Sequence, residues 1–497
     1  MRHLGHGRLL RMRLWPRGLH GSHGLTRAIA QVAGRFILST VDMKLRELKR
    51  LDRELTAYVD SLIAGMGRPE RRQAMSDYVT GLLLDGDRKS IEPMAGRLVD
   101  DAAELQAMRQ RLQQCVTVSP WSDAKMWQRL AVKMDAELPD VEVWVADDTG
   151  FPKKGSHSVG VQRQYSGTLG RKDNCQVAVS LHLAGEKGSS CVGMQLYLPE
   201  SWTQDRERCR KVGIPDDVPF QKKWEISLSQ IDAAISWGLA RRVVLADAGY
   251  GDVTDYRDGL TARGLPYVVG INGVQVLWAP GTAPIPPPPV RPPGQRGNTP
   301  CRWKTGEQKP VTASALAVAR GRKACRTVTW REGSRGRQQS TFGGVRVRSA
   351  HHHLQGEPPG EEQWFVYEWP LDEAEPTKFW LATLPADASL KKLVGLAKLR
   401  WRVERDYQEM KQEIGLDHFE GRGWRGFHHH AALCAVGHGF LALRRALFPP
   451  EEDAVDAAGS PPATPAGAAA AARHLPAVPP QRRRREPAAG AVENVIE

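Results

Sequence analysis

The spacing of apolar residues divides the chain into a helical first part, a strand-rich middle and a helical last part. From Lys44 to about Lys133, apolar residues recur every three or four positions, as in "LRELKRLDRELTAYVDSLIAGM". This spacing places them on one side of a helix. We therefore expect several short helices, which form an all-helical N-terminal domain over residues 43–135.

The middle of the chain changes to the period of strands. "VEVWVADD" (141–148) is apolar and rich in valine, and residues 174–185 and 190–199 form two further runs bounded by Gly or Pro. An amphipathic helix is expected over 225–240, followed by strand, helix and strand up to residue 271. The resulting β-β-β-α-β-α-β order predicts an α/β fold, with a mixed sheet and helices on its faces.

Residues 272–385 interrupt this series. The stretch "APGTAPIPPPPVRPPGQRG" is too rich in proline for a helix or a central strand, so we expect an exposed loop. Around it lie strand-like segments, which are "RTVTWREG", "TFGGVRVRSA", "QWFVYEWP" and "TKFWLATLP". A β-rich insertion is predicted here. Helical spacing then returns within 386–448, and one continuous helix is expected from about Ser389 to Ile414.

Candidate ligating side chains follow two of the predicted strands. Asp147 and Asp148 end the first, and Asp247 follows "RRVVLA" and precedes a Gly-rich turn. In open α/β sheets, ligands bind at the carboxyl ends of strands. Taken singly, an Asp at such a place is more often a turn or helix-capping residue. Because successive strand residues face opposite ways, only one of Asp147 and Asp148 can be the ligand.

A third candidate acid lies on the predicted C-terminal helix. Arg400 and Glu404 are four residues apart and Lys411 is seven further on, so all three share one face. The face displays base, acid, base. The alternative is an exposed ion pair, which contributes only a few tenths of a kcal/mol. Spacing alone leaves the two interpretations open.

The net charge of the chain favours one kind of binding partner. The chain of 497 residues has 70 Lys and Arg against 56 Asp and Glu, a formal charge of +14. This balance favours an acidic partner such as nucleic acid. Lys153 and Lys154 place positive charge directly after the paired acids. For the N-terminal helices, a packing or dimerisation role and DNA-end recognition are both open.

Cysteine and histidine usage excludes some classes of protein. The seven cysteines include no CxxC pair, so neither a zinc ribbon nor a disulfide framework is indicated, and the pattern is typical of cytosolic thiols. No apolar run approaches the roughly 20 residues of a membrane span. We do not expect the histidine triplets 351–353 and 428–430 to bind metal, because adjacent side chains point in different directions.

Both ends of the chain differ in composition from the rest. Residues 1–42 hold seven arginines and no acid before Asp42. A transit peptide, a basic arm or a true start at Met43 would each account for this, and we assign the segment no function. Residues 449–497 are rich in Ala and Pro and end near "QRRRRE". We expect a disordered tail whose arginines add at most nonspecific attraction to DNA.

Four sequence blocks, in this order, resemble bacterial insertion-sequence transposases of the DDE superfamily. They are "DDTGFPKKGSHSVGVQRQYSGTLGRKDNCQVAVSL", "LPESWTQDRERCRKVGIP", "VLADAGYG" and "RWRVERDYQEMKQEIGLDHFEGRGWRGFHHH". The likeness runs from roughly Leu45 to Leu443. It implies a ribonuclease-H-like catalytic core, built from residues 136–271 and 386–448, with a DDE triad of metal-binding carboxylates.

The resemblance assigns the three acids. Asp147, Asp247 and Glu404 match the catalytic, metal-binding positions, with Asp148 as the variable neighbour. The expected cofactor is Mg²⁺ or Mn²⁺, as two ions. The expected partners are double-stranded DNA with terminal inverted repeats and target DNA, acted on by a homodimer in the bacterial cytoplasm, at the nucleoid. The alternatives are a catalytically silent DNA-binding derivative and a metal-dependent nuclease of the same fold.

The resemblance also implies contacts with DNA. Related transposases carry Tyr-x2-Arg-x3-Glu-x6-Lys around the glutamate, and the sequence departs from this pattern with Ala397 at the tyrosine position. The positions expected to bind DNA phosphates are Lys153, Lys154, Arg163, Arg400 and Lys411.

A tryptophan of the insertion is a further candidate for DNA contact. In related transposases such a residue assists DNA hairpins or flipped bases, and Trp303 or Trp330 would correspond. The alternative is that both fill the insertion core.

Overall fold

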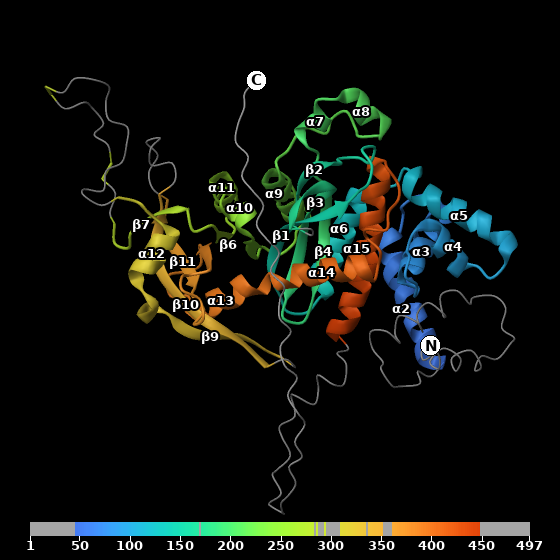
Figure 1. Cartoon of the computed structure of the whole chain (residues 1–497). Helices are drawn as coiled ribbons and strands as arrows, with labels where there is room; N and C mark the ends of the chain where they lie inside the picture. Colours follow the sequence, from blue (N-terminus) through green and yellow to red (C-terminus); the bar gives the residue numbers. More distant parts are fainter. Residues whose placement is uncertain are drawn as a thin grey trace, which may run out of the picture. The chain divides into compact units, whose positions relative to one another are not determined.

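The computed structural model describes residues 45–167, 170–282, 309–333, 336–350 and 360–447, with two short pieces at 285–286 and 293–294 (Figure 1). The predictions for residues 1–42, the tail 449–497 and most of the Pro-rich loop lie outside the described residues. So do those for His351–His353 and Trp303.

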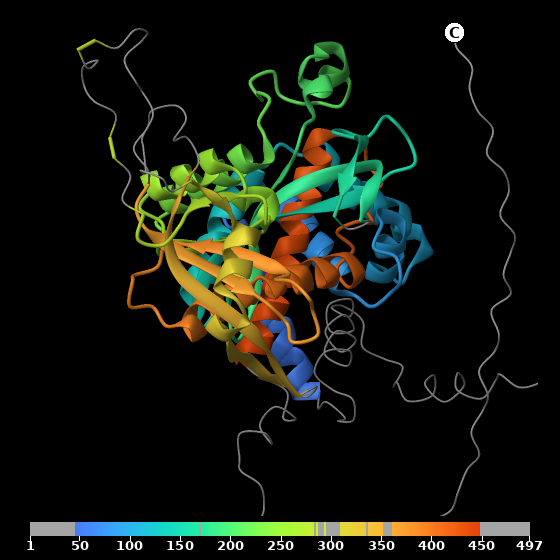
Figure 2. The same ribbon diagram turned by 60° about the vertical axis from the view of Figure 1, so that its left-hand side comes forward.

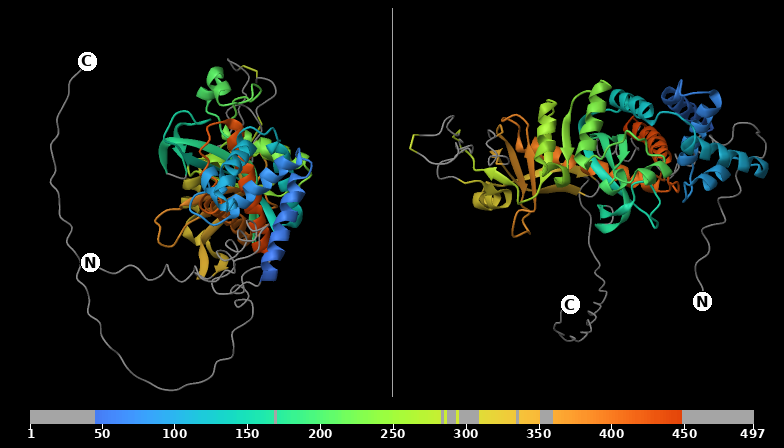
Figure 3. Two further views of the ribbon diagram at one scale, coloured as in Figure 1. Left: turned by 90° about the vertical axis from the view of Figure 1, so that its right-hand side faces the viewer. Right: turned by 90° about the horizontal axis from the view of Figure 1, so that it is seen from above.

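Five helices occupy residues 45–137, and a long C-terminal helix packs against them. Their bounds are α2 Leu45–Ile63, α3 Pro69–Leu83, α4 Ile91–Leu98, α5 Ala102–Thr117 and α6 Asp123–Glu137. Helix α15 (Trp424–Leu447) lies between these helices and strand β4 (Figure 3). Tyr58 Oη donates to Val436 O at 3.1 Å, and a Cβ on Gly439 would lie only 2.7 Å from that hydroxyl. The N-terminal helices and the sheet therefore share one hydrophobic core through α15.

The central sheet has the predicted mixed character. Its first strands are β1 Val141–Pro152, β2 Gln162–Ser166, β3 Arg171–Gly185, β4 Ser189–Leu196, β5 Val243–Ala246 and β6 Tyr267–Ile271. Strand β1 is antiparallel to β3 and parallel to β5, and β5 is parallel to β6. Strand β2 was not predicted, because its sequence "QRQYS" is an edge strand with four of five side chains exposed or half-buried and carries no apolar period.

The insertion extends the same sheet (Figure 2). Its described elements are β7 Val276–Trp278, β8 Val311–Thr312, α12 Ala313–Arg320, the 3-10 helix η1 Arg322–Ala324, β9 Arg326–Gly333, β10 Gly336–Ser349, β11 Gln363–Glu368 and β12 Lys378–Ala382. Strand β12 is antiparallel to β6, which joins insertion and core. Within the described residues the strand order is β2-β3-β1-β5-β6-β12-β11-β10-β7-β8, with β4 on β3 and β9 on β10.

Helices connect and cover the core strands. They are α7 Glu200–Thr203, α8 Arg206–Lys211, α9 Lys223–Ser236, α10 Ala248–Gly251, α11 Thr254–Ala262, α13 Leu390–Leu399 and α14 Trp401–Gln412. The single helix predicted from Ser389 to Ile414 is wrong, because it is interrupted at Arg400. There Val403 N–H donates to Arg400 O, three residues back, which is a tighter step than the α-helical one. No helix in the described part of the chain is long and apolar enough to cross a membrane.

Candidate functional site

Asp147 and Asp247 lie at matching positions on two neighbouring strands. The parallel pairing of β1 and β5 joins Val143 to Val243 and Val145 to Leu245. Continued by two residues, this register sets Asp147 beside Asp247, the first residue after β5. Adjacent strands are about 4.8 Å apart. Two acids separated by 100 positions in the sequence are thus brought side by side, Asp147 within β1 and Asp247 directly after β5.

The adjacent acids Asp147 and Asp148 point to different partners. Asp147 is buried and faces Arg400, which lies between α13 and α14, at 2.6 Å. Asp148 is half-buried and accepts from Lys223 Nζ of α9 at 2.9 Å. This is the alternation expected of a strand, and it separates the two carboxylates. Asp147 therefore shares its surroundings with the other candidate acids, whereas Asp148 belongs to an ion pair with α9.

The turn after β5 fixes Asp247. Its carboxylate caps the four-residue helix α10 and accepts from Gly249 N–H at 2.9 Å. The next turn passes so close to β6 that a Cβ on Gly251 would lie 1.9 Å from Gly270 O. Only glycine permits this approach. The Gly-rich sequence "DAGYG" therefore holds the backbone of Asp247 tightly against the sheet.

Arg400 joins the third acid to the first. Its Nη1 donates to Asp147 Oδ2 at 2.6 Å and its Nη2 to Glu404 Oε1 at 2.9 Å. The side chain of Glu404 remains 64% exposed. The negative charge of Asp247 also acts on Arg400. Three acids that were predicted from separate parts of the sequence thus lie around one guanidinium group.

Burial and mutual repulsion set the acidity of Asp147. Burial raises the pKa of this carboxyl to about 7, and the charges of Asp247 and Asp148 act in the same direction, while Arg400 opposes them. For Arg400, burial would lower the pKa, but the carboxylates of Asp147, Asp247 and Glu404 outweigh it and raise the pKa above its ordinary value. The site is therefore a strongly coupled cluster of negative charge held by one cation.

The donor set suits a hard divalent cation. Mg²⁺ and Mn²⁺ prefer oxygen ligands, and carboxylates supply them. In the part of the chain that the structure describes, no three His, Cys, Asp or Glu side chains are grouped to hold an ion, and the guanidinium of Arg400 stands between Asp147 and Glu404. The chemistry of the residues fits a metal, with Arg400 as the positive charge that a metal would replace.

The basic residues predicted to bind DNA have different surroundings. Lys154 and Arg163 are exposed. Lys153 is half-buried and donates to Phe419 O at 3.2 Å, and burial lowers its pKa. Lys411 donates to Gly150 O at 2.8 Å, and burial lowers its pKa to about 8. Lys411 thus connects helix α14 to strand β1. Lys153, in the turn after β1, connects that turn to the backbone at Phe419.

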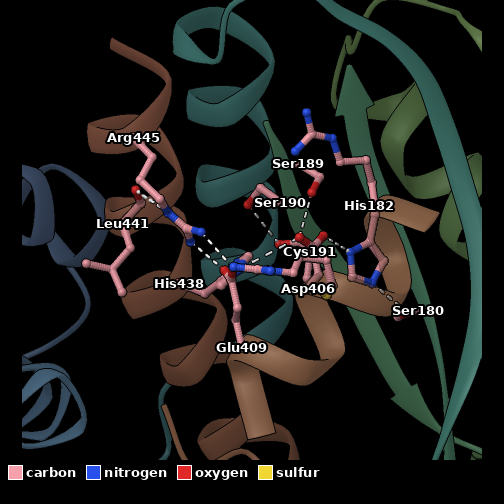
Figure 4. A network of polar contacts seen from close by, with 12 residues as sticks. Ser180, His182, Ser189, Ser190, Cys191, Asp406, Glu409, His438, Leu441 and Arg445 are labelled. Carbon is pink, nitrogen blue, oxygen red and sulfur yellow. Dashed lines mark hydrogen bonds and ion pairs between the residues drawn. The ribbon is translucent and has the colours of Figure 1, made fainter. Parts of the chain in front are cut away.

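A buried polar network behind the acids was missed by the sequence analysis (Figure 4). His182 Nδ1 lies 2.7 Å from Asp406 Oδ2, and Ser180 Oγ contacts both His182 Nε2 at 2.9 Å and Tyr407 Oη at 2.6 Å. Ser180 is also the cross-strand partner of Asp147. The network therefore connects strand β3, next to the first acid, with helix α14, which carries the third.

The network continues to α15 one turn further along α14. Glu409 accepts from Arg445 at 2.7 Å and lies 3.2 Å from His438 Nε2. Ser189 Oγ donates to Asp406 Oδ1 at 2.6 Å. The signal in the sequence is the pair Ser180 and His182, two polar residues two positions apart in the otherwise apolar run 177–185 of β3, which must share one face.

The histidine triplet of α15 has separate buried partners. His428 Nε2 accepts from Leu196 N–H of β4 at 3.3 Å, His429 Nε2 contacts Trp121 O at 2.9 Å, and His430 Nδ1 contacts Tyr78 Oη of α3 at 2.8 Å. The three rings are thus used in packing α15 against three different segments.

The sequence of this chain is similar to those of known proteins. Residues 61–337 match the family described as DDE superfamily endonuclease. The chain is also 32% identical, over 166 residues, to the probable transposase for insertion sequence element IS701 of Microchaete diplosiphon. That match covers 33% of this chain and 41% of the relative, so the chain spans less than half of the relative's length. With its mixed sheet and flanking helices in the ribonuclease-H-like arrangement, the chain belongs to the DDE superfamily of endonucleases.

Proposed function

We propose that this protein is an active transposase, which cuts DNA strands at the ends of an insertion sequence and transfers them to target DNA. The observation that carries the proposal is the double contact of Arg400 with Asp147 and Glu404, beside the in-register Asp247. The gathering of three acids from distant parts of the sequence around one cation supports a shared metal site, in which divalent ions would take the place of that single positive charge.

In the proposed reaction, Asp147, Asp247 and Glu404 hold two Mg²⁺ or Mn²⁺ ions. When bound, such ions activate the attacking water or 3′-hydroxyl and stabilise the departing 3′ oxygen of the phosphodiester. Asp147 must give up its proton to serve as a ligand, and a bound cation would favour this by opposing the burial that raises its pKa. The tight turn at Gly251 keeps Asp247 in place while Glu404, which is exposed, adjusts.

The basic residues of the site are the proposed contacts to the DNA phosphates. With the carboxylates neutralised by cations, the Arg400 guanidinium would be available to bind a DNA phosphate. Lys154 and Arg163, which are exposed, add contacts to the incoming strand. Phosphate contacts of this kind supply sequence-independent affinity. End recognition by the N-terminal helices and a homodimeric active complex belong to the same proposal.

The test is a cleavage assay with a duplex that carries the terminal inverted repeat flanking the gene. We expect nicking at the repeat in Mg²⁺ or Mn²⁺, none in excess EDTA, and calorimetric binding of Mn²⁺ that Asp147→Asn abolishes. Cleavage in EDTA would overturn the metal site. Binding of the repeat without cleavage in either metal would indicate the silent derivative, and cleavage of any duplex without preference would indicate a nuclease.

A further inference from the structure

A charged cavity lies where the insertion meets the core. Its volume is about 660 Å³, which is within the usual range of ligand pockets. Strand β9 contributes Trp330 and Arg331, helix α13 contributes Lys391, and the start of α14 contributes Trp401 and Arg402. We call it the β9 pocket. Its wall also includes the start of β1, so it lies toward the opposite end of that strand from Asp147.

A β-bulge shapes the wall of the β9 pocket. Thr329 pairs with Gln339 and Arg331 with Gln338, so Trp330 is an extra residue on β9. In a regular strand, successive side chains face opposite ways, yet four successive residues, 329 to 332, line this pocket. Bulges redirect side chains in this manner and are common beside functional sites. The backbone of β9 is therefore bent so that an aromatic and a cationic side chain both face the cavity.

Two guanidinium groups crowd one aromatic ring in this wall. Arg331 lies 4.2 Å and Arg402 4.4 Å from the ring centre of Trp401. Arg402 donates to Gly185 O at 3.1 Å. Burial, and then the charge of Arg331, lower the pKa of Arg402 to about 10. The two cations therefore repel each other in a partly desolvated place, and a bound anion would relieve that repulsion.

The acids in the wall do not neutralise these cations. Glu142 pairs with Lys392 at 2.6 Å and Glu332 with Arg337 at 2.9 Å, and Glu186, the third acid in the wall, is exposed. Among the described residues, no carboxylate forms an ion pair with Arg331, Arg402 or Lys391; the ion pairs that the chain does make join other side chains. Guanidinium groups present paired donors that match the oxygens of a phosphate.

We propose that the β9 pocket binds the phosphate backbone of the transposon-end DNA, away from the point of cleavage. The inference rests on the proposed function. Glu142 in the pocket wall is five residues before Asp147 on β1, a distance of about 17 Å along the strand. For DNA that runs along β1, at about 3.4 Å per nucleotide, this distance corresponds to about five nucleotides between the bound phosphate and the scissile phosphate.

Matched double variants test this proposal. Arg331→Ala with Lys391→Ala removes two pocket cations, and Lys323→Ala with Arg326→Ala removes two exposed cations nearby that do not line the pocket. All four side chains are exposed, so we expect unchanged melting temperatures. The log–log salt slope for binding the inverted-repeat duplex falls by about 1.8 in the pocket variant, and stays at the wild-type value in the control. Equal slopes in both variants would overturn the proposal.

Neutral phosphates locate the contact. A methylphosphonate placed about five nucleotides from the cleavage position weakens end binding by wild-type protein and has no further effect on the pocket variant. If the pocket variant bound ends normally and lost only the capture of target DNA in a strand-transfer assay, the pocket would serve target DNA and the proposal would be wrong. Binding to a scrambled duplex, which lacks the inverted repeat, distinguishes a failure of the pocket proposal from a failure of the proposed function. A reduced slope there, with no cleavage of ends by wild-type protein, would support the pocket and refute the transposase.

Discussion

His182 and Asp406 form a buried ion pair, with 2.7 Å between Nδ1 and Oδ2, that fastens helix α14 to strand β3. The helix carries Glu404 two residues before Asp406, and β3 carries Ser180 opposite Asp147. The positions of the first and third acids therefore depend on one pair of side chains that touches neither of them. This arrangement makes His182 and Asp406 positioning residues.

Replacing the pair should impair cleavage more than end binding. Asp406→Asn leaves a buried imidazolium without its counter-charge, and breaking a buried pair in this way costs about 3–5 kcal/mol of stability. We expect a lower melting temperature, and at temperatures where the variant is still folded, a reduced cleavage rate with an unchanged dissociation constant for the inverted repeat. Normal cleavage by a folded but destabilised Asp406→Asn protein would show that the pair is structural only.

A pH series provides an independent readout of the same pair. Burial opposes the charge on His182, but Cys191 and Asp406 outweigh it and raise its pKa to about 10. A raised histidine pKa stabilises the folded state fully below the unfolded value of about 6.5, and this stabilisation is lost as the pH rises towards 10. The difference in unfolding free energy between wild type and His182→Gln should therefore be largest near pH 6 and shrink by pH 9.

The two neighbouring acids should differ sharply in effect. Asp147→Asn should abolish cleavage while end binding persists, because the proposed ligand is lost. Asp148→Asn should reduce cleavage much less, since Asp148 faces Lys223 of α9. The measurement is the single-turnover cleavage rate of both variants at equal occupancy of the inverted repeat. The opposite order of losses would assign the first ligand to Asp148.

The raised pKa of Asp147 predicts a stability change of defined sign. Its folded pKa of about 7 exceeds the usual value near 3.9, so the folded protein keeps the proton that the unfolded chain has released. Between pH 4 and 7 this lowers stability as pH rises, by at most about 4 kcal/mol in total. Asp147→Asn removes the effect, so its melting temperature relative to wild type should increase from pH 5 to pH 8 in metal-free buffer. A constant difference would contradict the burial argument.

The place of Asp247 directly after an apolar strand could be predicted from "VVLAD", because β5 ends at Ala246. The sequence predicts that Asp147 ends its strand as well, but β1 continues to Pro152 and its residues 149–151 are buried, so Asp147 lies within the strand. The break at Arg400 could not be predicted, since neither Gly nor Pro marks it and the apolar spacing runs through it. That break sets the direction of the Arg400 side chain, and hence the contact between Asp147 and Glu404.

The His182–Asp406 pair and the β9 pocket could not be predicted from the sequence, because both depend on tertiary contacts. His182 and Asp406 are 224 positions apart, and each alone resembles an ordinary polar residue in its own element. The β9 pocket depends on a bulge whose extra residue, Trp330, is fixed by pairing with β10. Local pattern carries no information on either feature, because both are decided by the partner across the fold.

The face of α14 should separate into catalytic and DNA-contacting roles. Glu404→Gln should remove cleavage and retain or strengthen DNA binding, because a negative charge near the phosphates is lost. Arg400→Ala should weaken end binding and reduce the log–log salt slope by about 0.9. Lys411→Ala should do the same if its ammonium exchanges Gly150 O for a phosphate. If Lys411 serves only the backbone contact seen at 2.8 Å, the melting temperature falls and the slope does not change.

Gel-shift titrations of the three variants at several salt concentrations, paired with cleavage rates and melting temperatures, decide among these roles. An exposed ion pair between Arg400 and Glu404 that served stability alone would contribute at most about 1 kcal/mol, and would leave both cleavage and the slope at wild-type values. Normal cleavage by the Glu404→Gln variant would show that Glu404 is not a catalytic ligand. Glu409 is then a poor substitute, because Arg445 and His438 already hold it in the buried network, and Glu413 would be the next acid to replace.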